Sequence, residues 1–136
     1  TCALPISGKR GPYAKELLSS VFRINISYAA AEAVFKDVTI PTWIVRTLRI
    51  YPQAEALHPD CLGALVSLVF NRGTDLKGDR RIEMLEIQEA LRDKKEGRIP
   101  NLILNMRRLW PNTQGLQRRR EAEAKLFQEG LISTTD

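Results

Sequence analysis

Residues that would support a β-rich, metal-bound or membrane-spanning protein are scarce in this sequence. No glycine lies between Pro12 and Leu62. Tight β-hairpins need residues that tolerate positive φ, so this stretch cannot readily form a glycine-rich β lobe. The single histidine, His58, has no cluster of cysteines or carboxylates at ligand spacing, which argues against a metal site and against a Ser-His-Asp triad. No apolar run approaches the length needed to cross a bilayer.

Cysteine is equally rare, since the chain has only Cys2 and Cys61. Cys61 stands at the start of an apolar segment, where a free thiol behaves as a small hydrophobic group, and we expect no disulfide. Cys2 belongs to residues 1–10, which we predict to be a disordered or non-native leader. Because the chain does not begin with methionine, we expect a fragment, with a helical domain over residues 11–136 that is truncated at its N-terminus.

Positive charge is the main excess in the composition, and it is concentrated in one region. The 136 residues are 43% hydrophobic and 27% charged, with a net charge of +5, which is typical of a single globular domain. Between residues 98 and 125 the cations outnumber Glu121 and Glu123 enough to account for the whole excess. The sequence therefore favours a polyanionic partner, such as cell wall, nucleic acid or anionic lipid. The cations of this stretch are Arg98, Arg107, Arg108, Arg118, Arg119, Arg120 and Lys125.

Helical spacing of apolar residues runs through most of the chain, and we predict an all-α fold. A nearly continuous apolar run from Gly63 to Phe70 predicts a helix that is buried on nearly every side and ends at Gly73. Ser27 and Asp79 are suitable N-caps for two further helices. We expect helices near residues 12–20, 28–37, 42–50, 60–72, 79–94, 99–110 and 116–129.

The last three of these helices carry apolar stripes that predict their buried faces. Residues 99–110 are expected to form one amphipathic helix that runs through Trp110 and ends at Pro111. For the helices on either side, we expect the core to include Ile82, Met84, Leu85, Ile87, Leu91, Leu116, Ala122, Leu126 and Phe127.

Two sequence blocks carry a resemblance to a known family. The first is ALVSLVFNRG, residues 64–73, and the second is GLQRRREAE, residues 115–123. In order and spacing they resemble the C-terminal half of phage-type lysozymes, glycoside hydrolase family 24 and its pesticin-like relatives. The resemblance implies a lysozyme-like large helical lobe of about six helices around a buried central helix. It also implies a peptidoglycan hydrolase or endolysin that cleaves the β-1,4 bond between N-acetylmuramic acid and N-acetylglucosamine.

The resemblance has further implications for partners and location. An enzyme of this family needs no cofactor or metal, and we expect a monomer that acts on the bacterial cell wall, in the periplasm or outside the cell. The family's catalytic glutamate, at the end of an N-terminal helix and followed by a Gly-Tyr-Gly turn and an Asp/Thr pair, has no match here. Glu16 is the only glutamate on an early helix, and no such turn follows it. We therefore expect a chain that supplies one wall of the cleft and is inactive alone.

Four residues are the candidates for substrate binding. The family's Phe-Asn-x-Gly turn borders the cleft, which implies that Asn71 lies near bound sugar. The pattern Gly-Leu-x-x-Arg-Arg-x-x-Glu is met in full, and it implies that Arg119 or Arg120 pairs with the missing glutamate or holds the wall's acidic peptide stem. Trp110 has an apolar ring face on which a sugar can stack.

Each candidate also has a structural explanation, which the sequence leaves open. Asn71 can bond the local backbone, and Trp110 fits the apolar stripe of a core helix. The arginine run can be a solvated face with pairs such as Arg118 to Glu121 and Arg120 to Glu123. The alternative function is a non-enzymatic basic helical module that binds nucleic acid or another polyanion.

Overall fold

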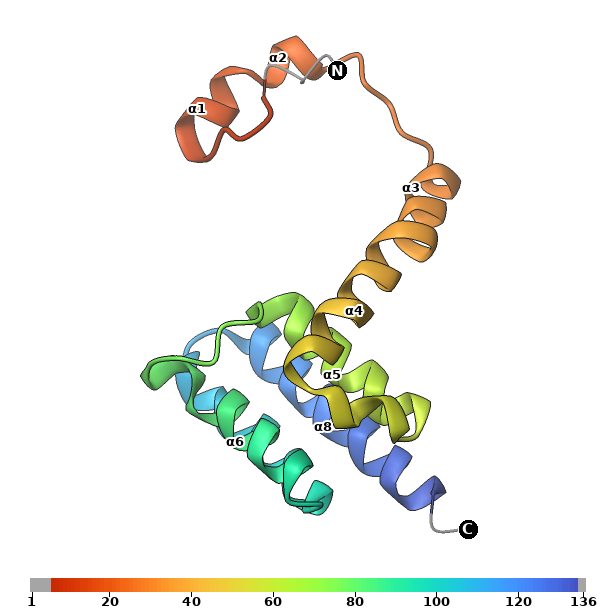
Figure 1. The fold of residues 1–136 in the computed structure, drawn as a ribbon. Coiled ribbons are helices and arrows are strands. Elements are labelled where there is room, and N and C mark those ends of the chain that lie inside the picture. The colour runs from red at the N-terminus through yellow and green to blue at the C-terminus, as the bar shows by residue number, and fades with distance from the viewer. Residues whose placement is uncertain (1–5, 135–136) are drawn as a thin grey trace. The chain divides into compact units, whose positions relative to one another are not determined.

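The structure, a computed structural model, describes residues 6–134, and all regular structure within them is helical (Figure 1). No strand occurs in this part of the chain. The predicted all-α class is therefore confirmed. Cys2 and the first half of the predicted leader lie outside the described residues.

The chain divides into two compact units, with the boundary between Val38 and Thr39. Helix α3 in the first unit begins as predicted, because the Ser27 hydroxyl accepts a hydrogen bond of 3.2 Å from the Ala30 amide. No residue of the three α-helices in this unit is buried. The assignment of residues 11–136 to one domain stays a prediction. The helices are α1 (Gly11–Glu16), α2 (Leu18–Val21) and α3 (Tyr28–Val34), and a π-helical turn (Phe35–Thr39) follows them.

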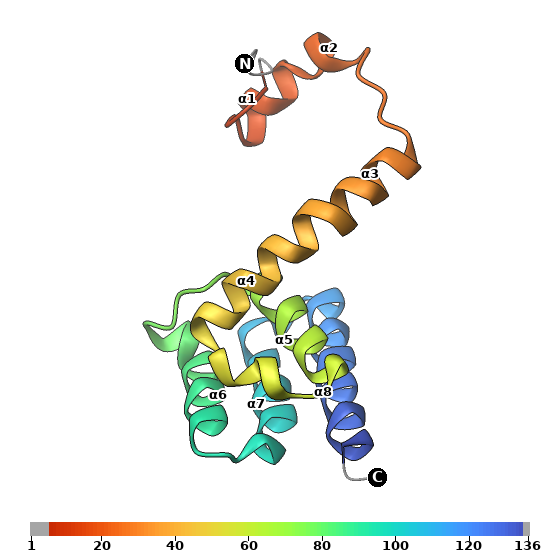
Figure 2. The ribbon, with the colours of Figure 1, turned by 45° about the vertical axis from the view of Figure 1, so that its right-hand side comes forward.

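The second unit, whose helices pack side by side in Figure 2, holds the hydrophobic core. Helix α5 contacts α4 and α8, and α7 contacts α6 and α8. No helix among residues 6–134 is both long and apolar enough to span a membrane. The α-helices are α4 (Ile40–Ile50), α5 (Pro59–Arg72), α6 (Ile82–Arg92), α7 (Ile99–Asn105) and α8 (Gln114–Ser133). The 3-10 turns are Pro52–Ala56, Asp79–Arg81, Glu96–Arg98 and Met106–Leu109.

Helix α5 starts and stops where the sequence predicts. Pro59 occupies its first turn, and the ring nitrogen Nδ1 of His58 accepts a 3.2 Å hydrogen bond from the Asp60 amide. Gly73 ends the helix at a φ of 79°, a conformation that favours glycine. Burial on nearly every side is wrong, however, because Phe70 is 44% exposed and packs edge-on against Trp43.

The later helices correct several predictions. Asp79 does not cap α6 but begins a 3-10 turn, and Ile82 and Leu85 are exposed. Glu83 is buried in their place, since Arg108 neutralises it with an ion pair. Such a pair depends on residues far apart in sequence, so the apolar pattern alone does not reveal it.

The predicted helix over residues 99–110 is likewise interrupted. Helix α7 ends at Asn105, a 3-10 turn follows, and Trp110 leaves the helix with a φ of −138°. In α8, Ala122 is exposed and Ala124 is buried. The other end of the predicted stripe is confirmed, because Phe127 is fully buried and Leu126 packs against the core.

Helices α5 and α8 meet closely at Cys61, which is free and fully buried. Its thiol donates a hydrogen bond of 3.3 Å to the Phe127 carbonyl. Burial, together with the nearby Asp60 charge, raises the pKa of the Cys61 thiol to about 11. The thiol is thus protonated at neutral pH and is shielded from solvent.

We expect slow labelling of this thiol in the folded protein. In a Cys2→Ser background, Cys61 should react with a thiol reagent at pH 8 at least about tenfold more slowly than in urea, because only the exposed thiolate is a nucleophile. The measurement is the rate of thionitrobenzoate release with and without denaturant. Equal rates would contradict the burial of Cys61 between α5 and α8.

Candidate functional site

A buried carboxylate, Glu123, joins the two blocks that carry the family resemblance. Glu123 lies on α8 and is 4% exposed. Its Oε1 accepts hydrogen bonds from Ser67 Oγ on α5 at 2.7 Å, from Arg119 Nε at 3.1 Å and from Arg120 Nη2 at 2.8 Å. Its Oε2 lies 2.7 Å from Arg120 Nε. Glu123 is therefore an electrostatic link between α5 and α8, and it is not a free acid.

The two arginines predicted from the family pattern have different environments. Arg120 is fully buried, and this desolvation lowers its pKa although the Glu123 charge opposes the shift. The side chain of Arg119 is 35% exposed, and its Nη2 also donates to the Ser67 carbonyl at 3.0 Å. Only Arg119 can present part of its guanidinium to a ligand without a rearrangement of the core.

The predicted pairing along this helix is half confirmed. Arg120 and Glu123 form the predicted pair. Glu121 instead pairs with Arg107, with 2.9 Å between the charged atoms, and Arg118 is exposed. The solvated-face explanation therefore fits Arg118 and Glu121, but it does not fit Arg120 and Glu123, which belong to the interior.

Two guanidinium groups lie over the ring of Trp110. The Cζ atom of Arg72 is 4.9 Å from the ring centroid, and that of Arg120 is 5.7 Å away. Burial, and then the charges of Arg81, Arg80 and Arg120, lower the pKa of Arg72 to about 10. Arg72 Nε and Arg120 Nη1 are buried and have no hydrogen-bond partner within residues 6–134. Positive charge thus exceeds negative charge around this tryptophan.

Asn71 stands apart from the hydrogen bonds around Glu123. It is exposed at the end of α5, next to Arg72. No residue in the described range forms a hydrogen bond with its side chain. The structure brings Arg119 and Arg120 together at Glu123, with Arg120 over the Trp110 ring, and leaves Asn71 exposed at the end of α5. The alternative explanation, a bond from Asn71 to the local backbone, is not formed in this part of the chain.

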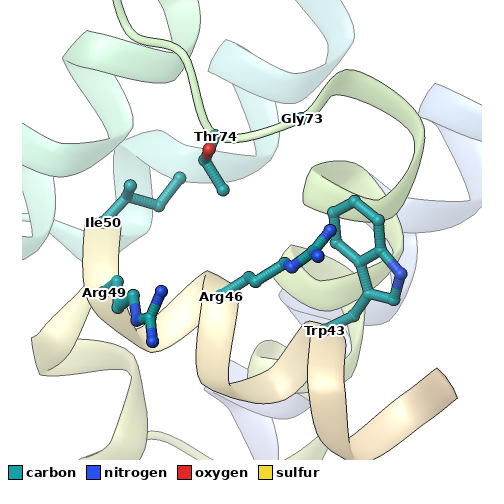
Figure 3. A pocket seen from close by; sticks show the side chains of 6 residues that line it. All are labelled: Trp43, Arg46, Arg49, Ile50, Gly73 and Thr74. Atoms are coloured by element: carbon teal, nitrogen blue, oxygen red, sulfur yellow. The ribbon is translucent and has the colours of Figure 1, made fainter. Parts of the chain in front are cut away.

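A pocket of about 410 Å³ lies between α4 and the turn that follows α5 (Figure 3). One side is the face of α4 that carries Trp43, Arg46, Arg49 and Ile50, and the other side is formed by Gly73 and Thr74. The sequence reasoning overlooked the two arginines. Trp43, Arg46 and Arg49 follow one another at intervals of three residues, and this spacing is the available signal because it gives one helix face.

Among residues 6–134 there is no group of three or more His, Cys, Asp or Glu side chains able to hold a metal. The charges at the candidate site are mostly guanidinium groups, which bind carboxylates and phosphates but do not transfer protons at neutral pH. Glu16 is exposed on α1, in the other unit.

Comparison with known proteins gives no further identification. No protein-family model matches the chain. Neither a curated protein nor a solved structure matches it.

Proposed function

We propose that this chain is the large helical lobe of a lysozyme-type peptidoglycan hydrolase, forming one wall of the substrate cleft without the family's catalytic glutamate. One observation carries the proposal: the two sequence blocks that resemble the family are in direct contact. Ser67 of the first block donates to Glu123 of the second, and Arg119 donates back to Ser67. Two motifs at least 42 positions apart that are joined by hydrogen bonds to a buried carboxylate act as one structural unit.

In this proposal the four candidate residues have separate roles. Asn71 and Arg119 contact the glycan or its acidic substituents, since both have exposed polar atoms. Arg120 is a positioning residue, because it is fully buried and holds Glu123. Trp110 is partly buried, with the guanidinium groups of Arg72 and Arg120 over its ring, and contributes the part of the side chain that stays exposed.

The burial of Arg120 weakens the alternative function in nucleic-acid binding. A helix that tracks phosphates needs several exposed cations on one face. In the arginine run of α8, Arg118 is exposed, Arg119 is engaged with Glu123 and Ser67, and Arg120 is inaccessible. This favours a cleft wall over a phosphate-binding helix.

The test is co-sedimentation of the chain with purified insoluble peptidoglycan, together with a muropeptide release assay. We expect binding but no release of muropeptides, whereas a full-length phage-type lysozyme, the positive control, should release them. Absence of binding, combined with DNA binding that weakens steeply as salt rises, would overturn the proposal in favour of the alternative.

Muropeptide release by the chain itself would show that it does contain a catalytic acid. In that case Glu16→Gln is the decisive variant, because a general acid must be able to donate a proton and an amide cannot. Loss of release in Glu16→Gln would identify this residue as the acid.

A further inference from the structure

The pocket between α4 and the turn after α5 contains two guanidinium groups that the protein itself leaves available. Arg46 and Arg49 are both exposed and line the pocket. Within residues 6–134 neither forms an ion pair or a side-chain hydrogen bond. Arg72, Arg119 and Arg120, in contrast, donate to protein acceptors. The N–H donors of Arg46 and Arg49 are therefore free for a ligand.

Arg46 is held in place before any ligand binds. Its Cζ atom lies 4.6 Å from the centroid of the Trp43 ring, and the close-up shows the guanidinium group beside that ring (Figure 3). Trp43 is itself fixed by an edge-to-face contact with Phe70, at 5.2 Å between centroids and 72° between planes. A guanidinium group that is already oriented loses less entropy when it binds, and its edge keeps the paired donors that match a carboxylate.

The opposite side of the pocket adds backbone and a small polar group. Gly73 has a φ of 79°, and an added Cβ would meet no atom within 4 Å, so the chain turns here beside open space. Thr74 supplies a hydroxyl group, and Ile50 gives an apolar surface between the arginines and the turn. A volume of about 410 Å³ suits a group of small-molecule size.

We propose that this pocket binds the carboxylates of an acidic peptide, and that in peptidoglycan the occupant is the peptide stem. The inference rests on the proposed function for the identity of the peptide, but the pocket chemistry is independent of it. Two guanidinium groups separated by one helical turn suit two carboxylates, or one carboxylate and a neighbouring carbonyl. The stem is thereby assigned to Arg46 and Arg49 in place of Arg119 and Arg120, whose donors are largely used within the protein.

The experiment measures the affinity of the chain for a disaccharide tetrapeptide, for the same disaccharide without peptide, and for the free tetrapeptide. The variants are Arg46→Met and Arg49→Met, and the matched control is Arg118→Met, which removes the same charge from an exposed position on α8. We expect each pocket variant to raise the Kd of the disaccharide tetrapeptide about tenfold or more. The control should change it less than about twofold, because exposed distant charges are screened.

Three results would overturn the assignment. One is wild-type affinity in both pocket variants, and another is an equal loss in Arg118→Met, which would mean diffuse charge attraction. The third is displacement of the peptide by poly(glycerol phosphate) that itself binds more tightly through Arg46 and Arg49. That result would show that the pocket binds phosphate groups and not the carboxylates of a peptide.

The two proposals fail differently. Peptidoglycan binding that is unchanged in Arg46→Met and Arg49→Met would reject the pocket and leave the proposed function standing. Binding of the free tetrapeptide that needs both arginines, without any binding of insoluble peptidoglycan, would support the pocket and reject the proposed function. Absence of binding to every probe would reject both.

Discussion

Glu123→Gln is expected to lower the free energy of unfolding by about 3–5 kcal/mol, because it leaves a buried arginine without its counter-ion. The substitution keeps the size of the side chain but removes its charge. Arg120, which is fully buried, then keeps its positive charge without a counter-ion, and Arg119 loses its ion pair as well. Urea unfolding followed by circular dichroism measures the change.

Glu121→Gln is the matched control for this prediction. It lies on the same helix and removes the same charge, but its partner Arg107 is exposed and the pair is solvated. Exposed pairs contribute about 0–1 kcal/mol, so we expect a small change. Losses of equal size in Glu123→Gln and Glu121→Gln would contradict the importance of the buried pair.

A double variant separates the charge from the packing. Arg120→Met combined with Glu123→Leu removes both buried charges and fills the space with apolar atoms. Replacing a whole buried pair is often neutral, whereas removing one partner leaves an uncompensated charge. We therefore expect the double variant to be more stable than Glu123→Gln. A double variant that is less stable would mean that the shape of the pair, not its charge balance, stabilises the contact between α5 and α8.

Gly130→Ala is expected to destabilise the protein by about 1–3 kcal/mol, although alanine is normally the better helix former. A Cβ atom at position 130 would lie 2.6 Å from Cys61 Sγ and 3.0 Å from the Cys61 amide nitrogen. The first distance is shorter than real Cβ contacts and the second is tighter than most of them, and because the second is to backbone, α5 and α8 would have to shift apart slightly. Thermal or urea unfolding of the variant measures this cost.

Gly63→Ala is the matched control, and its expected effect on stability has the opposite sign. Gly63 lies inside α5, and an added Cβ there meets no atom within 4 Å. We expect Gly63→Ala to stabilise the protein by about 0.5–1 kcal/mol through helix propensity alone. Adding Cys61→Ala to Gly130→Ala should recover part of the loss, because the sulfur is removed while the backbone nitrogen stays. Stabilisation by Gly130→Ala itself would contradict the close contact of the two helices.

The elements that the sequence predicted best are those defined by local chemistry. Ser27 caps α3 and Gly73 ends α5, and each of these depends on residues within a few positions. The elements predicted less well depend on distant partners. Glu83 is buried because Arg108 reaches it, and α7 ends before Trp110, whose ring instead packs with Arg72 and Arg120.

The candidate site shows the same division. The family-like pattern on α8 predicts that Arg119, Arg120 and Glu123 belong together, but it does not separate the buried arginine from the partly exposed one. That distinction depends on which side of α8 faces α5. Arg46 and Arg49 were overlooked because α4 carries no recognisable motif. They line a pocket only because the turn at Gly73 and Thr74 lies opposite them in the folded chain.

The sequence by itself determined the helical class, the caps and stops of several helices, and the excess of positive charge, because these follow from residue type and short-range spacing. Tertiary structure alone decided which charges are buried, which arginines remain free to bind a ligand, and where glycine is required for contact between helices. Those properties depend on burial and on partners far apart in the chain. These properties are set by tertiary packing, which cannot be read from the spacing of residues along the sequence.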